Sequence, residues 1–461
     1  MNQSAFSSLP LSPVLLNNLD SLGYTAMTPI QAQSLPLMLQ GKDVIGQGKT
    51  GSGKTAAFGL TVLSNLNVKR FRVQSLVLCP TRELADQVAK EIRKLGRTIH
   101  NIKVLTLCGG MPMGPQIGSL EHGAHILVGT PGRILDHLEK GRIDLSELNT
   151  LVLDEADRML DMGFQDAMEA IIQAAPSERQ TLLFSATFPD QIQSVSQRIM
   201  LQPTLVKVES THANSSIHQA FYQVNSHEER LIAVKKLLLT RQPESAVIFC
   251  NTKKEVQEVA DELYHDGYSV IDLHGDLEQR ERDQSLVQFA NKSISILIAT
   301  DVAARGLDVD NLDMVINYQL SRDPEVHVHR IGRTGRAGNK GLACSLFSEK
   351  EAYRVALIDE FMDLPITPVS LPGDDVLSAT PYAAAMVTIE IAGGKKQKVR
   401  AGDILGALTG ENGISGKQVG KINLFDMRSY VAVEKHIAKN ALKKLESGKI
   451  KGRNFRARIL R

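Results

Sequence analysis

Two short stretches of the sequence combine residue types that together bind and cleave phosphate anhydrides. Residues 48–55 read GKTGSGKT and fit the pattern G-x-x-x-x-G-K-T. In such a loop, backbone N–H groups surround the β-phosphate, the lysine reaches the β- and γ-phosphates, and the threonine is a ligand of Mg²⁺. The sequence therefore predicts a nucleotide site made of Gly48, Lys49, Thr50, Gly51, Ser52, Gly53, Lys54 and Thr55.

The second stretch is acidic and reads DEAD at residues 154–157, after the apolar run Leu151–Leu153. Carboxylates at the carboxyl end of a central strand lie at the nucleotide crevice of an α/β sheet. We expect Asp154 to hold Mg²⁺ with Thr55, directly or through water, and Glu155 to orient and deprotonate the attacking water. The guanine-reading pattern N-K-x-D is not met by residues 251–254, which argues against a GTPase.

A third stretch, HRIGRTGRAG at residues 329–338, repeats arginine every third residue among glycines. Arginine on so flexible a backbone indicates that an anion approaches closely. The pair His327 and His329 has metal-ligand spacing, but no third and fourth ligands accompany it. A structural role for these histidines is therefore favoured over a metal site.

Elements that could position these stretches alternate along most of the chain. Continuous, mainly apolar runs of three to five residues suit parallel strands buried on both faces, and the amphipathic stretches Glu83–Leu95 and Lys253–Tyr264 suit crossover helices. The pattern predicts an α/β fold with doubly wound parallel sheets. Polar, aperiodic segments at residues 209–216 and 369–381 divide the chain into domains 1–208, 217–368 and 382–461. The predicted strands are Ser75–Cys79, Ile126–Val128, Thr150–Leu153, Thr181–Phe184, Ala246–Phe249, Ile294–Ile298 and Met314–Ile316.

The composition of the 461 residues is that of an ordinary globular protein, with 43% hydrophobic and 23% charged residues. Its four cysteines are scattered, with no C-x-x-C pair, as expected for reduced core thiols. The first residues lack the basic and apolar regions of a secretory signal, and no run approaches the ~20 apolar residues of a membrane span. These features predict a soluble, cytoplasmic protein.

The last eighty residues have a separate plan and a strong positive charge. From residue 382 onward, 17 lysines and arginines stand against six acidic residues. This balance favours a polyanionic partner such as nucleic acid. Periodicity predicts the order β-α-β-β-α-β, the ferredoxin-like order of an RNA-recognition motif. The predicted elements are strand Met386–Ile391, helix Ala401–Leu408, strands Lys421–Phe425 and Ser429–Val433, helix His436–Leu445 and strand Phe455–Leu460.

Taken together with Ser185-Ala186-Thr187, the DEAD and HRIGRTGR stretches resemble those of the DEAD-box ATP-dependent RNA helicases over residues 6 to about 345. The resemblance implies two tandem RecA-like domains and ATP with Mg²⁺ as cofactors. It implies that Phe6, Tyr24 and Gln31 read the adenine, with Gln31 bonding its edge. It assigns the ribose to Asp308 and the γ-phosphate to Arg333 and Arg336, and it implies that Ser185 and Thr187 couple hydrolysis to strand separation.

The same resemblance implies a set of RNA contacts in both helicase domains. Loops and helix starts of this kind present N–H and arginine donors to phosphates. An arginine delivered across a cleft between domains acts only when the cleft closes, so RNA that bridges both domains would gate ATP hydrolysis. The implied RNA-binding residues are Arg82, Gly110, Thr130, Gly132 and Arg133 in the first domain and Gly275 and Thr300 in the second.

The sequences LCGG at 107–110, LHGDLEQR at 273–280, GALTG at 406–410 and KIKGRNFR at 449–456 resemble the bacterial DbpA family over nearly the whole chain. That resemblance implies a tail that recognises a hairpin of 23S ribosomal RNA and a role on pre-50S particles during large-subunit assembly. Among the strand residues that stack bases in an RNA-recognition motif, only Tyr430 is aromatic here. We therefore expect Tyr430 to contact RNA from the sheet and basic loops to bind structured RNA, mainly through Lys395, Lys396, Lys398, Lys449, Lys451 and Arg453.

Two other functions stay open at this stage. A DNA helicase would carry the same phosphate motifs, and comparing RNA with DNA as activators of the ATPase would separate the two. An RNA-binding assembly scaffold with a vestigial ATPase is the second alternative. It is disfavoured because all the residues needed for hydrolysis are present.

Overall fold

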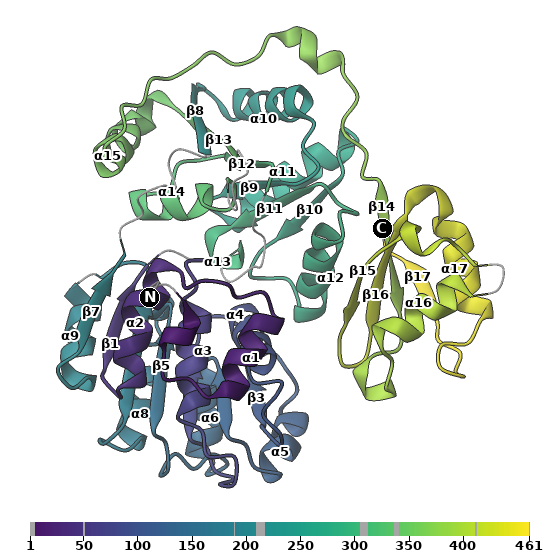
Figure 1. Cartoon of the computed structure of the whole chain (residues 1–461). Coiled ribbons are helices and arrows are strands. Elements are labelled where there is room, and N and C mark those ends of the chain that lie inside the picture. The colour runs from purple at the N-terminus through teal and green to yellow at the C-terminus, as the bar shows by residue number, and fades with distance from the viewer. Residues whose placement is uncertain are drawn as a thin grey trace. The chain divides into compact units, whose positions relative to one another are not determined.

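The computed structural model describes residues 5–48, 51–188, 190–208, 217–304, 312–335, 341–410 and 413–460, and Figure 1 shows the course of the chain. The chain divides into two compact units near residue 211. The first unit contains one β-sheet and the second contains two. Within the described residues, every helix is too short or too polar to span a membrane.

The first domain is a seven-stranded parallel sheet, in the order β3-β4-β2-β5-β6-β1-β7. Apolar side chains form a core on each of its faces, one beneath α1–α4 and one beneath the later helices, as expected for a doubly wound fold (Figure 1). Its strands are β1 Val44–Gln47, β2 Ser75–Leu78, β3 Val104–Leu107, β4 Ile126–Gly129, β5 Thr150–Asp154, β6 Gln180–Ser185 and β7 Thr204–Lys207. Its helices are α1 Pro13–Ser21, α2 Pro29–Leu39, α3 Lys54–Ser64, α4 Arg82–Leu95, α5 Met113–Glu121, α6 Pro131–Glu139, α7 Ala156–Asp161, α8 Gln165–Ala174 and α9 Asp190–Ile199.

The strand order of this sheet explains how distant motifs meet. The phosphate loop follows β1, the acidic stretch ends β5, and Ser185 ends β6. These three strands are neighbours in the order β5-β6-β1. Because they are parallel, their carboxyl ends lie at one edge of the sheet, where α/β proteins bind ligands.

The second domain is a six-stranded parallel sheet in the order β10-β11-β9-β12-β13-β8. It confirms the doubly wound α/β class for this part of the chain. Its strands are β8 Ile217–Gln223, β9 Ala246–Cys250, β10 Val270–Leu273, β11 Ile296–Thr300, β12 Met314–Asn317 and β13 Gly341–Phe347. Its helices are α10 His227–Arg241, α11 Lys253–His265, α12 Gln279–Ala290, α13 Asp301–Ala304, α14 Pro324–Ile331 and α15 Ala352–Met362.

The segment 369–381, which the sequence indicates only as a joint, is held against the second domain. Residues Asp374–Ser378 form a 3₁₀ turn on α10, and Asp374 pairs with Lys236 at 2.6 Å. The backbone N–H of Val369 donates to the carbonyl of Phe221 at 2.8 Å, and the Gln242 side chain donates to the carbonyl of Thr380 at 3.0 Å. The joint is thus an ordered strap along α10.

The third domain has the predicted β-α-β-β-α-β order. Its antiparallel sheet is ordered β15-β16-β14-β17, and two helices cover one face around an apolar core. The elements are β14 Met386–Ile391, α16 Ala401–Thr409, β15 Val419–Leu424, β16 Ser429–Glu434, α17 Ala438–Ser447 and β17 Ala457–Ile459. The four cysteines of the chain are buried and form no disulfide, which agrees with the expected core thiols.

Candidate nucleotide and RNA sites

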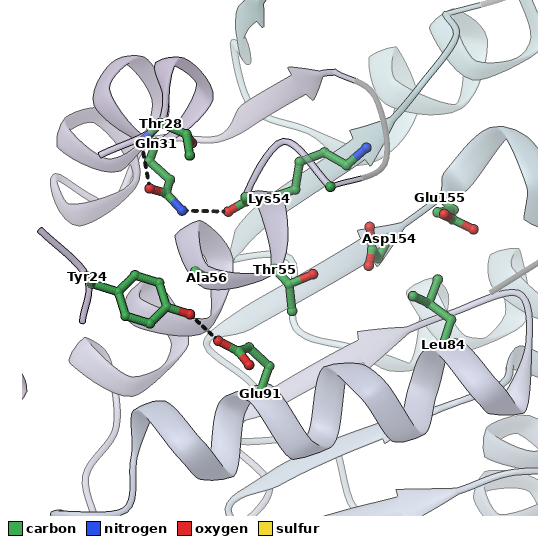
Figure 2. A pocket seen from close by; sticks show the side chains of 12 residues that line it. Tyr24, Thr28, Gln31, Lys54, Thr55, Ala56, Leu84, Glu91, Asp154 and Glu155 are labelled. Atoms are coloured by element: carbon green, nitrogen blue, oxygen red, sulfur yellow. Dashed lines mark hydrogen bonds between the residues drawn. The ribbon is translucent and has the colours of Figure 1, made fainter. Parts of the chain in front are cut away.

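A cavity of about 300 Å³ lies at the carboxyl edge of the first sheet (Figure 2). Tyr24 and Gln31 line one end of it, Lys54 and Thr55 line the middle, and Asp154 and Glu155 line the other end. These residues come from three separate parts of the sequence. The cavity therefore brings together the predicted base-reading, phosphate-binding and metal-binding residues.

The phosphate loop has the backbone that the glycine pattern predicts. Gly51 and Gly53 adopt left-handed φ angles of +82° and +97°, which favour glycine. A Cβ on Gly53 would also overlap the amide of Gln31, so Gln31, the residue predicted to read the base, is in close contact with the loop. Lys49 and Thr50 lie outside the described residues.

Lys54 is buried at the start of α3, and its ammonium group donates to the carbonyl of Gly48. Burial lowers the pKa of Lys54, while the nearby Asp154 and Glu155 oppose that shift. The side chain thus lies between the loop and the acidic residues. A phosphate bound in the loop would offer the ammonium group a charged acceptor in place of a backbone carbonyl.

The acidic stretch ends β5 in a strained turn. Burial, reinforced by the charge of Glu155, raises the pKa of Asp154 to about 7, and Lys54 opposes the shift. Glu155 has a left-handed φ of +53°, unusual for a non-glycine residue and frequent at functional sites. Its carboxylate accepts a bond from Arg158 at 2.8 Å. Glu155 is thus held by a partner that sequence reasoning missed.

A second missed contact links the acidic stretch to Ser185-Ala186-Thr187. One carboxylate oxygen of Asp157 accepts the backbone N–H of Thr187 at 3.1 Å and its hydroxyl at 2.9 Å. The contact ties the turn after β5 to the turn after β6. A movement of either turn would therefore displace the other or break these hydrogen bonds.

Several groups at this edge fit a phosphorylated ligand and Mg²⁺. Within the described residues, the hydroxyls of Thr28, Ser52 and Ser185 are buried without a hydrogen-bond partner. Buried polar atoms of this kind are rare unless a ligand or water satisfies them. Thr55 and Asp154 supply the oxygen ligands that Mg²⁺ prefers, and the ion takes most of its other ligands from water and phosphate. When bound, Mg²⁺ would neutralise charge on the phosphates.

Two of the residues predicted to read the base, Tyr24 and Gln31, line one end of the cavity. The side-chain oxygen of Gln31 accepts the backbone N–H of Thr28 at 2.9 Å, and its amide donates to the carbonyl of Gly53 at 3.0 Å (Figure 2). The rings of Phe6 and Tyr24 form a T-shaped pair with 6.0 Å between their centroids. Tyr24 and Gln31 line the cavity next to the phosphate loop, and the roles of all three residues in reading adenine stay predictions.

The predicted RNA contacts of the first domain gather where β2, β3 and β4 end. Gly110 has a φ of +68°, and a Cβ there would overlap the guanidinium of Arg82. The Thr130 hydroxyl accepts the N–H of Gly109 at 3.4 Å, and Arg133 donates to the carbonyl of Met111 at 3.0 Å. A Cβ added to Gly132 would have no neighbouring atom within 4 Å. The structure therefore brings these five predicted residues to one edge.

In the second domain a buried arginine joins three motifs. Arg330 donates to both carboxylate oxygens of Asp301 at 2.6 and 2.7 Å, and to the side chain of Asn251 at 2.9 Å. Thr300, next to Asp301, accepts the N–H of Ala303 at 3.3 Å. Sequence reasoning did not assign this role to Arg330. A fully buried arginine with a bidentate carboxylate partner fixes the geometry of the strand ends around it.

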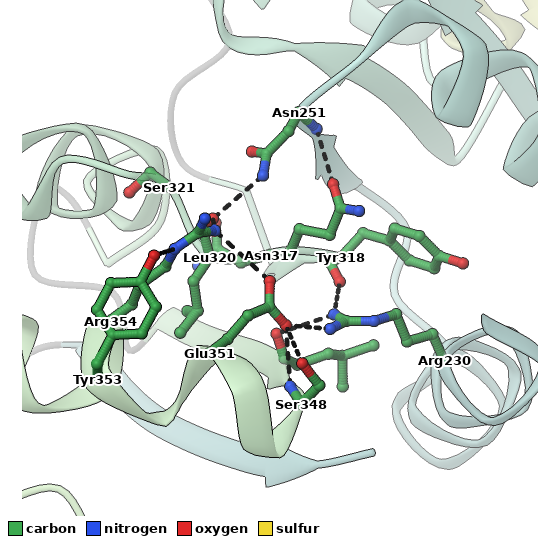
Figure 3. A network of polar contacts seen from close by, with 12 residues as sticks. Arg230, Asn251, Asn317, Tyr318, Leu320, Ser321, Ser348, Glu351, Tyr353 and Arg354 are labelled. Atoms are coloured by element: carbon green, nitrogen blue, oxygen red, sulfur yellow. Dashed lines mark hydrogen bonds and ion pairs between the residues drawn. The ribbon is translucent and has the colours of Figure 1, made fainter. Parts of the chain in front are cut away.

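A neighbouring network supports the same strand ends (Figure 3). Arg230 donates to the carbonyl of Tyr318 at 2.5 Å and pairs with Glu351, which also accepts from Ser348. Asn251 donates to the carbonyl of Leu320 at 3.2 Å. These contacts hold the loop after β12 against α10 and against the segment that follows β9.

The remaining predicted residues of the second domain are placed only in part. Arg333 follows α14 and is largely buried, with its carbonyl accepting the N–H of Leu312 at 3.1 Å. Gly275 lies in the turn after β10 with open space around its Cα. Asp308 and Arg336 lie outside the described residues. Their assigned contacts with ribose and γ-phosphate stay predictions.

His327 has a structural environment. Its ring contacts Asn317 and Gln219 at 3.4 and 3.2 Å and lies beside Phe221. Burial, with the charge of Arg330, lowers its pKa to about 3. The described residues contain no cluster of three or more potential His, Cys, Asp or Glu metal ligands.

Acidification should therefore destabilise the second domain through His327. Its folded-state pKa lies below the unfolded value, so the stability it confers is present above about pH 6.5 and is lost as the pH falls toward 3. Between pH 7.5 and 5 we expect a loss of about 2 kcal/mol, measured by hydrogen exchange of the β12 and β13 amides. His327→Gln should remove this component, whereas a change at the exposed His265 should not. Equal pH dependence in both variants would contradict the assignment.

In the third domain, the sheet face opposite α16 and α17 is contacted by residues in and just after α12, which belongs to the same compact unit. Thr388 contacts Asn291 at 3.2 Å and Ser293 at 2.6 Å, both at the end of α12. Glu390 is buried and pairs with Arg428 at 2.9 Å and Arg458 at 2.5 Å. The same carboxylate lies 3.5 Å from Arg280 of α12, a cluster that sequence reasoning missed.

Tyr430 lies in this covered region with only 2% of its surface exposed. Burial and the nearby Glu390 raise the pKa of its hydroxyl. Its ring is not open to a stacked base in this arrangement, so its role as an RNA contact gains no support. The predicted basic side chains are all exposed: Lys395, Lys396, Lys398, Lys449, Lys451 and Arg453.

Comparison with known proteins agrees with this geometry. Residues 28–195 match the model of the DEAD/DEAH box helicases, residues 229–338 that of the helicase conserved C-terminal domain, and residues 388–459 that of the DbpA RNA binding domain. A structure of Saccharomyces cerevisiae Dbp5 bound to RNA and ADP BeF3 is 32% identical, with a TM-score of 0.71, and the match covers 80% of this chain and 96% of that one. The two RecA-like domains and their site define an ATP-dependent RNA helicase of the DEAD-box class.

The similarity to particular helicases extends over the third domain. The ATP-dependent RNA helicase DbpA of Escherichia coli is 53% identical over 459 residues, which cover 99% of this chain and 100% of that protein. DbpA of Bacillus subtilis is 38% identical, and the match covers 98% of each chain. The chain belongs to the DbpA family of DEAD-box helicases.

Proposed function

We propose that this helicase is an RNA-gated ATPase that locally unwinds structured RNA during assembly of the large ribosomal subunit. Lys54 and the phosphate loop hold ATP, Gln31 and Tyr24 select adenine, and Asp154 and Thr55 hold Mg²⁺. Glu155 takes a proton from the attacking water, because a carboxylate in this position can act as a general base. Its bond to Arg158 keeps it oriented.

The gate follows from the division of the chemistry between two domains. Arg333 and Arg336 belong to the second domain, whereas the phosphate loop belongs to the first. In the proposed mechanism, RNA that contacts both domains favours their closure, and the arginines then stabilise charge on the γ-phosphate. Arginines supplied in this way are worth about 10³–10⁵ in rate. The network around Arg330 supports this step by fixing the segment that precedes Arg333.

The target is proposed to be a hairpin of 23S ribosomal RNA in pre-50S particles, bound by the basic loops of the third domain. One observation carries the choice of surface: the ammonium group of Lys451 donates to the carbonyl of Lys398 at 3.0 Å. This bond joins two basic segments that are far apart in the sequence. With Tyr430 and Glu390 covered, these loops form an exposed cationic surface that a folded RNA could meet by shape and phosphate contacts.

Neutralising the basic loops should weaken recognition of the target RNA. For the triple variant Lys395→Gln, Lys396→Gln and Lys449→Gln, the RNA concentration that half-activates the ATPase should rise at least about tenfold. The slope of the logarithm of the RNA-binding constant against the logarithm of the salt concentration should become shallower by about 0.7–0.9 for each lost phosphate contact. Maximal turnover with saturating RNA should stay near normal.

The matched control is Lys435→Gln, Lys439→Gln and Lys443→Gln, which removes the same charge from exposed positions on the α17 side of the domain. Both variants are tested with a 23S ribosomal RNA fragment that contains the hairpin. If the two triple variants lose affinity equally, the domain attracts RNA by net charge alone and the proposed surface is wrong.

A further inference from the structure

The Tyr24 ring is held from a helix of the first domain rather than by its own loop. Its hydroxyl donates to a carboxylate oxygen of Glu91 on α4, and both residues line the nucleotide cavity (Figure 2). Lys94 lies 5.3 Å from the centre of the ring and 3.6 Å from the Glu91 carboxylate. Burial and the bond to Glu91 raise the pKa of Tyr24, so its hydroxyl remains a donor at any physiological pH.

The helix that carries Glu91 is a rigid element. It begins at Arg82, is capped by the Thr81 hydroxyl at 3.3 Å, and buries an unbroken apolar face against the first core. Glu91 lies nine residues after Arg82, or about 13 Å along the helix axis. The guanidinium at the first turn, next to Gly110, and the carboxylate that holds Tyr24 therefore belong to one body.

We propose that Glu91 is a positioning residue for the base of ATP, which fixes the Tyr24 ring in the cavity and ties it to the helix whose first turn carries Arg82. The inference rests on the proposed placement of adenine beside Tyr24 and Gln31. Glu91 does not act on the γ-phosphate in this arrangement. It holds the ring equally in the ground state and the transition state, so its loss changes KM rather than kcat.

The test compares steady-state ATPase kinetics at saturating RNA in six variants of the full chain. Glu91→Ala and Tyr24→Phe each remove the hydrogen bond, and each should raise the KM for ATP about three- to tenfold with kcat within about twofold of normal. The double variant should be no worse than the more affected single one, because both changes delete the same contact. Glu91→Gln keeps an acceptor and should restore most of the affinity. Lys90→Ala, an exposed change on the same helix, should have no effect.

Other outcomes would overturn the inference. Additive effects in the double variant, a fall in kcat at unchanged KM, or a Gln variant as impaired as the Ala variant would each show that Glu91 does not act through the Tyr24 hydroxyl. Tyr24→Ala separates this failure from that of the proposed base site. If Tyr24→Ala leaves the KM unchanged, adenine does not bind beside Tyr24 at all. If Tyr24→Ala raises the KM and Glu91→Ala does not, only the role of Glu91 is wrong.

Discussion

Replacing Glu155 by glutamine is expected to lower RNA-stimulated ATP turnover by about 10²–10⁴-fold while ATP and RNA still bind. The amide keeps the size of the carboxylate but cannot accept a proton from the attacking water. The variant also loses the charge that pairs with Arg158 at 2.8 Å, so part of the effect would come from a less ordered side chain. Single-turnover phosphate release and equilibrium ATP binding measure the two quantities separately.

Glu139→Gln is the matched control. Glu139 is exposed at the end of α6, and its replacement removes one negative charge from the same domain. Its turnover should be normal. If the Glu155 variant hydrolysed ATP at the normal rate, Glu155 would not be the base. If that variant lost turnover and still supported assembly of ribosomal subunits fully, the scaffold alternative would gain support.

Lys54→Ala is expected to abolish ATP turnover, with a loss of at least about 10³-fold. The ammonium group is the only predicted cation of the phosphate loop among the described residues, and it is buried beside Asp154 and Glu155. Its removal would take the nearby positive charge away from Asp154, leave Glu155 with Arg158, and weaken ATP binding as well as hydrolysis. Nucleotide binding by calorimetry and steady-state turnover together give the result.

The control for this variant is Lys42→Ala, an exposed lysine just before β1 in the same domain. The circular dichroism spectrum and the melting temperature of both variants should match those of the unchanged chain, which shows that the first domain is folded. Turnover above about a tenth of normal in Lys54→Ala would contradict the assignment of the phosphate loop.

Much of the fold could be predicted because many strands of the two helicase domains are short, mainly apolar runs, whereas strands with polar residues, such as β8 Ile217–Gln223, were not named in advance. All seven strands named in advance are present, with ends shifted by at most two residues. Short stretches of sequence also predict the phosphate loop, the acidic stretch and the elements of the tail. Each of these features combines a strand with a turn or a helix that follows it directly in the chain. Parallel strands then bring their carboxyl ends to one edge without further information.

The contacts that sequence reasoning missed join residues far apart in the chain. Arg330 with Asp301 and Asn251, Tyr24 with Glu91, and Thr388 with Asn291 are examples. Charged or polar residues at such positions also occur on solvated surfaces, so their type and spacing carry no signal. Only the packing of one element on another shows that these side chains are buried and paired.

The anchoring of the strap at residues 369–381 could not be predicted from the sequence for a related reason. Proline, glycine and aspartate there indicate a break in regular structure, which is correct. They do not show that Asp374 meets Lys236 at 2.6 Å or that Leu371 joins the core of the second domain. The absence of periodicity predicts irregular backbone but says nothing about whether that backbone is anchored.

The most direct measurement compares the steady-state ATPase of the whole chain with that of a chain ending at Thr380, which keeps the strap on α10. Each is titrated with total RNA, a 23S ribosomal RNA fragment that contains the hairpin, and single-stranded DNA. We expect the whole chain alone to be strongly stimulated at low concentrations of the ribosomal fragment, with little response to DNA. Equal stimulation of both chains by any RNA would contradict targeting by the third domain. No stimulation by any nucleic acid would contradict the RNA-gated ATPase itself.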